Sequence, residues 1–161
     1  MEYYISRAGF ANLQQKKKKI LETIEFRQQQ IGASVKLDND LRENPEFISL
    51  RTELTYVLPR RLSEIEQVLG FCRIIEEMSG LKDSEFDKVQ LGARVGILYE
   101  DGTTVTYLIL GYEETDIDND IISYLSPIAQ SLLGKGVGDY AEINTPGGVI
   151  RVKITSVERG L

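Results

Sequence analysis

The sequence predicts an α+β protein: an N-terminal antiparallel coiled-coil hairpin, followed by an antiparallel β-sheet domain with a short helix. Apolar residues recur at alternating steps of three and four on both sides of an acidic stretch, which is typical of two packed helices. The last part of the chain instead has β-favouring runs separated by turn residues. We therefore expect a hairpin over residues 1–80, with an acidic tip near residues 37–47, and a globular domain over residues 81–161.

Composition excludes several kinds of site. The chain has 161 residues, one cysteine and no histidine. It therefore lacks the residues for an internal disulfide, for the common zinc sites and for Ser–His or Cys–His nucleophile pairs. Any metal bound here must be a hard ion held by oxygen, such as Mg²⁺ or Mn²⁺. The net charge of −6 argues against general nucleic-acid binding and favours a protein partner.

The sequence also indicates a cytoplasmic location. No apolar run approaches the roughly 18 residues that a membrane span needs. The first seven residues lack the basic and apolar segments of a secretory signal. The single cysteine, Cys72, suits a reducing compartment, and its place on an apolar seam indicates a small buried hydrophobic residue.

The first predicted helix extends from about Phe10 to Val35 and would be on the order of 39 Å long. That length exceeds the needs of a compact domain, so we interpret the helix as a protruding arm. The run Lys16–Lys19 is interpreted as a solvated helix face, with contact to RNA as the alternative. The seam positions are Phe10, Leu13, Lys17, Ile20, Ile24, Arg27 and Ile31.

The second predicted helix contains one extra residue. Its seam begins at Phe47, Leu50, Leu54 and Val57, and resumes displaced by one residue at Leu58, Leu62, Ile65, Leu69, Cys72 and Glu76. Pro59 lies at the displacement, where it removes a helical hydrogen bond. An extra residue beside a proline predicts a kink or bulge. We expect the helix to end at Ser79-Gly80, with the glycine as a left-handed cap.

The head is expected to contain a β-hairpin over residues 94–110, turning at residues 100–102. A short helix over 127–133 follows, with Ser126 as its N-cap and Pro127 in its first position. Strands over 141–144 and 149–158 complete the sheet. The acidic run 116–120 lacks the glycine and distal glutamate of a calcium loop, so we interpret it as a solvated connection.

Several segments resemble the bacterial Gre family of transcript cleavage factors. The tip, residues 40–47 (Asp-Leu-Arg-Glu-Asn-Pro-Glu-Phe), resembles the family's acidic tip, and residues 61–66 and 73–76 are similar to the end of its second helix. Segments 122–129, 133–135, 137–139 and 144–148 resemble its C-terminal signature. Together these segments cover nearly the whole chain in the family's order.

The resemblance implies a coiled-coil hairpin followed by an FKBP-like domain. It also implies a transcription elongation factor whose head binds RNA polymerase at the rim of the secondary channel while the hairpin passes down the channel. The factor would not be an enzyme itself, would bind no cofactor of its own and would act as a monomer. It would stimulate the polymerase to cleave the 3′ end of a backtracked nascent RNA.

The resemblance also places the functional residues. The essential tip carboxylates fall on Asp40 and Glu43, and a basic residue falls on Arg51. Asp40 would contribute to the second Mg²⁺ held by the polymerase, Glu43 would assist it or position the attacking water, and Arg51 would hold a phosphate or tie the tip together.

Three alternatives remain open from the sequence. Asp40 and Glu43 also fit a capping box that would start the second helix without any metal. A Gre-like regulator or inhibitor could occupy the same channel without stimulating cleavage. Extra tip acids occur among such proteins, and Asp38 is an extra acid here. A prolyl isomerase is a third possibility, which the head disfavours because it has no Trp and no Phe after Phe86.

Overall fold

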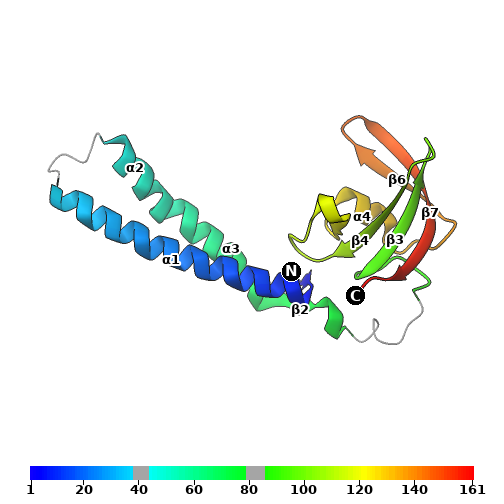
Figure 1. Cartoon of the computed structure of the whole chain (residues 1–161), viewed down its shortest axis with the longest axis horizontal. Coiled ribbons are helices and arrows are strands. Elements are labelled where there is room, and N and C mark those ends of the chain that lie inside the picture. The colour runs from blue at the N-terminus through cyan, green and yellow to red at the C-terminus, as the bar shows by residue number, and fades with distance from the viewer. Residues whose placement is uncertain (38–43, 79–85) are drawn as a thin grey trace. The chain divides into compact units, whose positions relative to one another are not determined.

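The computed structural model describes residues 1–37, 44–78 and 86–161. They form two compact units: Ala11–Phe71 is one, and Met1–Phe10 together with Cys72–Leu161 is the other. The first is a helical hairpin and the second, called the head below, is built around a β-sheet (Figure 1). The expected α+β class is confirmed.

The hairpin packs a long helix against a broken one. Helix α1 spans Arg7–Leu37, and the returning arm consists of α2 (Pro45–Thr52), a π-helical turn (Glu53–Val57) and α3 (Leu58–Phe71). The first predicted seam is confirmed, because its members are the residues withdrawn from solvent along α1. The second is confirmed in part: Val57 is 54% exposed, and Cys72 and Glu76 lie beyond the end of α3. The most deeply buried are Leu13, Leu58, Ile65 and Val68.

The π-helical turn accommodates the extra residue predicted from the displaced seam. The backbone N–H of Leu58 donates to the carbonyl of Glu53, five residues earlier, instead of the usual four. The turn ends next to Pro59, which has no N–H to donate. Leu58 remains buried although it lies one residue out of step with Leu54, so the expected bulge is confirmed.

The second helix ends earlier than the sequence predicts. Helix α3 stops at Phe71, and Cys72–Ile74 forms strand β2, which pairs in parallel with β1 (Tyr3–Ile5). A 3-10 turn over Ile75–Glu77 follows, with Ile75 fully buried. The end expected at Ser79-Gly80 is therefore wrong, because backbone pairing with β1 replaces the last two helical turns. Cys72 is half-buried, and this burial raises the pKa of its thiol.

The head contains a five-stranded sheet in the order β5-β4-β3-β7-β6. Its strands are β3 (Ala93–Tyr99), β4 (Thr104–Leu110), β5 (Ile121–Ser123), β6 (Tyr140–Thr145) and β7 (Gly148–Arg159). Neighbouring strands are antiparallel except for β4 and β5, which are parallel, so the sheet is mixed where a wholly antiparallel one was expected. The expected turn before β4 is present, and Gly102 adopts a positive φ of 86° there.

Helix α4 (Pro127–Leu132) begins as predicted, since the Ser126 hydroxyl accepts from the Ala129 N–H at 3.2 Å. Its buried residues Ala129 and Leu132 belong to the core cluster of the head. Most of the other large members of that cluster come from the sheet: Val95, Ile97, Ile109, Ile122, Ile143, Val152 and Ile154.

Within the ranges that the structure describes, no helix combines the length and apolar character required to cross a membrane.

Candidate functional site

The returning arm of the hairpin begins with a capped helix at Asn44. The Asn44 Oδ1 atom accepts hydrogen bonds from the backbone N–H groups of Glu46 at 3.0 Å and Phe47 at 3.4 Å. Pro45 occupies the first helical position, which needs no N–H donor. The hypothesis that Asp40 caps this helix is wrong, because the capping residue of α2 lies four positions later.

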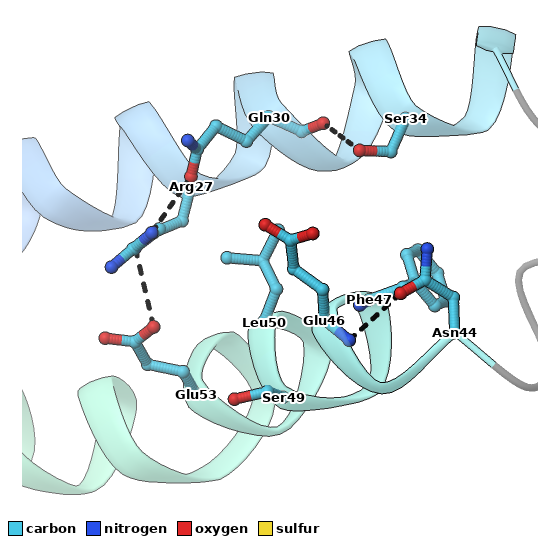
Figure 2. Close-up of a pocket in the computed structure, with 9 residues that line it drawn as sticks. All are labelled: Arg27, Gln30, Ser34, Asn44, Glu46, Phe47, Ser49, Leu50 and Glu53. Carbon is cyan, nitrogen blue, oxygen red and sulfur yellow. Dashed lines mark hydrogen bonds and ion pairs between the residues drawn. The ribbon is translucent and has the colours of Figure 1, made fainter.

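A polar notch of about 320 Å³ lies between the two arms beside this cap. Helix α1 contributes Arg27, Gln30 and Ser34, and the returning arm contributes the remaining side chains (Figure 2). The full lining is Arg27, Gln30, Ser34, Asn44, Glu46, Phe47, Ser49, Leu50 and Glu53. Phe47 and Leu50 are the apolar members of the wall and are half-buried.

An ion pair joins the two arms at one end of the notch. The Arg27 Nε atom lies 3.4 Å from Glu53 Oε2, and Arg27 Nη1 donates to Gln30 Oε1 at 3.0 Å. Arg27 is a seam position and is half-buried, and its charged end meets Glu53 in the π-helical turn. A second pair, Lys17 Nζ to Glu66 Oε1 at 2.9 Å, joins the arms further along.

The basic run Lys16–Lys19 on α1 contains one residue of the seam and three exposed residues. Lys17 belongs to the seam and is half-buried, whereas Lys16, Lys18 and Lys19 are exposed. The prediction of a solvated face is therefore confirmed for the exposed three. Contact between this face and RNA stays a prediction.

Of the predicted site residues, Asp40 and Glu43 lie outside the described residues. Arg51 is exposed in the last turn of α2 and is not part of the notch wall. The described residues contain no cluster of three or more carboxylate, histidine or cysteine groups that could hold a metal ion. Within the described part of the hairpin, the notch wall offers hydrogen-bonding and charged groups but no histidine, cysteine or lysine to serve as a nucleophile or base.

The acidic run in the head has the solvated character expected of it. Asp116 Oδ2 accepts from Asn119 Nδ2 at 2.7 Å, and a 3-10 turn covers Ile117–Asn119. All residues from 115 to 120 are exposed. The run therefore forms a local turn between β4 and β5.

Comparison with known proteins identifies the family of this chain, beginning with the head. Residues 83–159 match the family model of the C-terminal part of transcription elongation factors GreA and GreB. The transcription elongation factor GreA of Sinorhizobium medicae is 34% identical over 166 residues, spanning 97% of this chain and 96% of the relative. The chain belongs to the GreA/GreB family.

A second relative agrees with this assignment. The GreA of Rickettsia prowazekii is 31% identical and spans 98% of this chain and 94% of its own length. The similarity to these transcription elongation factors thus extends over nearly the whole chain. Among solved structures, the GreA factor homologue Gfh1 of Thermus thermophilus is similar, with a TM-score of 0.43 and 21% identity over 98% of this chain and 99% of that one.

Three structural carboxylates of this GreA/GreB family member escaped prediction. Glu53 was not identified as the partner of Arg27, Glu76 was assigned to a helical seam, and Glu114 had no assigned role. The sequence did contain a signal for the Asn44 cap, since Asn44-Pro45 has the same form as Ser126-Pro127, which was interpreted correctly. No comparable local signal marks contacts between residues that are distant in the chain.

Proposed function

We propose that this protein is a cytoplasmic elongation factor that binds bacterial RNA polymerase and stimulates cleavage of backtracked RNA. Family membership carries the proposal. It is supported by the placement of an acidic segment, residues 38–43, between α1 and the Asn44 cap of α2. Because Asn44 caps α2, neither Asp40 nor Glu43 is needed to start that helix.

The chemistry follows from what the polymerase would supply. Hydrolysis of a phosphodiester by two metals uses ions roughly 3.5–4 Å apart that stabilise the attacking and leaving oxygens. Asp40 would complete the coordination of the second, weakly held Mg²⁺, and Glu43 would orient the attacking water. Arg51, exposed on α2, would pair with a phosphate of the RNA 3′ end. The factor would enter through the secondary channel with its head at the rim, as a monomer without a cofactor of its own.

The test uses backtracked elongation complexes supplied with Mg²⁺ and the full chain. We expect short 3′ RNA fragments with the wild-type protein and their loss with Asp40→Ala or Glu43→Ala. Glu46→Gln is the matched control, because Glu46 is an acidic residue of the same tip segment, in the first turn of α2, to which no role in cleavage is assigned. Arg51→Ala should weaken the response without abolishing it.

Two results would contradict the cleavage mechanism. If Asp40→Ala and Glu43→Ala both remain fully active, the tip assignment is wrong. If the wild-type protein slows elongation and releases no fragments, the chain is instead a regulator that occupies the same channel.

A further inference from the structure

Glu114, in the loop after β4, connects two stretches of the head that are far apart in sequence. Its Oε2 atom accepts hydrogen bonds from the backbone N–H groups of Ser6 at 2.8 Å and Gly111 at 2.9 Å. Its Oε1 atom accepts from the hydroxyl of Ser6, which is 2% exposed. One carboxylate therefore joins the residue that precedes α1 to the loop that follows β4.

Ser6 in turn holds the first turn of α1. Its hydroxyl oxygen accepts from the Gly9 N–H at 3.0 Å, as an N-cap side chain does. Glu76 adds a second carboxylate, whose two oxygens lie 3.0 and 2.9 Å from the Arg7 N–H. Negative groups are favourable at this end of a helix, because the first N–H groups are unpaired and the helix dipole is positive there.

Close packing surrounds Glu114. A Cβ atom at Gly9 would collide with the Glu114 carboxylate, and one at Gly111 would collide with the backbone of Tyr4 and Ile5. The Tyr112 N–H donates to the Tyr4 carbonyl at 2.7 Å. The start of α1 is thus attached to the loop by directed hydrogen bonds in a space with no room for a side chain at either glycine.

We propose that Glu114 is a positioning residue for transcript cleavage. It fastens the first turn of α1 to the loop after β4, so that binding of the head to the polymerase constrains the helix that leads to the acidic tip. The proposal rests on the proposed function, in which tip carboxylates must reach a metal site. Misplacement of a reacting group by about 1 Å can cost on the order of 100-fold in rate. Glu114 acts through Ser6 and α1 and contacts no reacting atom.

Glu114→Gln is the informative variant, because it keeps the side chain's shape but leaves one acceptor oxygen where the carboxylate has two. If that oxygen keeps the N–H groups of Ser6 and Gly111, the NH₂ group faces the Ser6 hydroxyl and cannot accept from it. Ser6→Ala removes the hydroxyl, and Ser6→Thr restores it. Asp118→Asn is the matched control, since it removes one negative charge at an exposed position of the neighbouring turn.

Cleavage should be measured as a function of factor concentration. We expect Glu114→Gln and Ser6→Ala to lower the maximal rate at least about tenfold, with the half-saturating concentration within about twofold of wild type. Ser6→Thr and Asp118→Asn should match wild type in both quantities. A maximal rate that Glu114→Gln leaves unchanged would overturn the proposal. So would a loss of rate that saturating factor restores, because that result would place the defect in binding.

A second measurement does not depend on cleavage. Spin labels at Gln28→Cys and Glu142→Cys, both exposed positions, would be compared in a Cys72→Ser background. Glu114→Gln should broaden the distribution of distances between them, and Asp118→Asn should not. Broadening without any cleavage by the wild-type protein would refute the proposed function and leave the fastening role intact. An unchanged distribution would refute the fastening role, whatever the cleavage result.

Discussion

Glu53→Gln should lower the free energy of unfolding of the hairpin by about 1 kcal/mol. The Arg27 and Glu53 charges are 3.4 Å apart. Coulomb's law gives about 5 kcal/mol at an effective dielectric constant of 20 and about 1 kcal/mol in water. The side chains are 37% and 34% exposed, so screening by solvent brings the net value toward the lower figure. Among the residues that the structure describes, the buried Arg27 Nε atom has no hydrogen-bond partner, and Glu53 is the acid that pairs with it.

The pair Arg60–Glu64 provides the internal control. Its Nε–Oε1 distance is 3.1 Å, shorter than that of Arg27–Glu53, but its side chains are 83% and 56% exposed. Glu64→Gln should therefore cost less than about 0.5 kcal/mol. The two variants separate the effect of partial burial from that of distance. Distance alone would make Glu64→Gln the more destabilising variant, whereas partial burial makes it Glu53→Gln.

A double-mutant cycle completes this test. Arg27→Met with Glu53→Leu should be at least as stable as either single variant, because an apolar pair on the seam removes both charges together. Urea unfolding of the full chain, followed by circular dichroism at 222 nm, measures each value. The reasoning is refuted if Glu53→Gln and Glu64→Gln cost the same, or if the apolar double variant is less stable than both single variants.

Further consequences can be checked on the same chain. Asn44→Ala should cost about 1 kcal/mol in urea unfolding through loss of the α2 cap, and Asn44→Asp should cost much less; equal losses would argue against a cap. Deletion of Tyr56, 69% exposed in the π-helical turn, should bring both halves of the second seam into one heptad register and keep the helical circular dichroism signal, whereas deletion of Arg61 within α3 should reduce it. Burial and the neighbouring Tyr107 hydroxyl raise the pKa of Tyr99 to about 12. Folding thus favours the neutral phenol of Tyr99, and this contribution to the free energy of unfolding should be present below pH 10 and be lost as the pH rises toward 12. Tyr99→Phe should remove the last tyrosinate step in a spectrophotometric titration.

Periodic and local features were predictable from the sequence. The seams of both hairpin arms, the bulge near Pro59 and the cap at Ser126 all follow from spacing or from neighbouring residues. Pairing between distant segments was not predictable in the same way. Strand β2 was assigned to a helix because Cys72 and Glu76 continue the heptad spacing, but its backbone pairs with β1 almost seventy residues earlier. Strand β5 has three residues, too few to show a period.

The candidate site was predictable only through resemblance. Asp40 and Glu43 fit a capping box as well as a metal ligand set, and no spacing rule separates the two. The structure shows that Asn44 is the capping residue of α2, which argues against the capping box but does not test the metal ligands. The choice of Arg51 rested on the family pattern alone, and an exposed position on α2 is compatible with phosphate binding without requiring it.

The carboxylates discussed above form two groups, those that stabilise the fold and those proposed to act on the polymerase. Glu53 and Glu66 meet cations across the hairpin, while Glu76 and Glu114 accept backbone N–H groups at the start of α1. Neutralising these four should move the unfolding midpoint. Asp40 and Glu43 precede the cap of α2, and we propose that they act at the polymerase, Asp40 on its second Mg²⁺ and Glu43 on the attacking water. Asp40→Asn and Glu43→Gln should therefore abolish cleavage while the midpoint stays at the wild-type value. An Asp40→Asn protein that unfolds earlier would show that Asp40 stabilises the fold, and a tip carboxylate already engaged in that way would be a poor donor to a metal held by the polymerase.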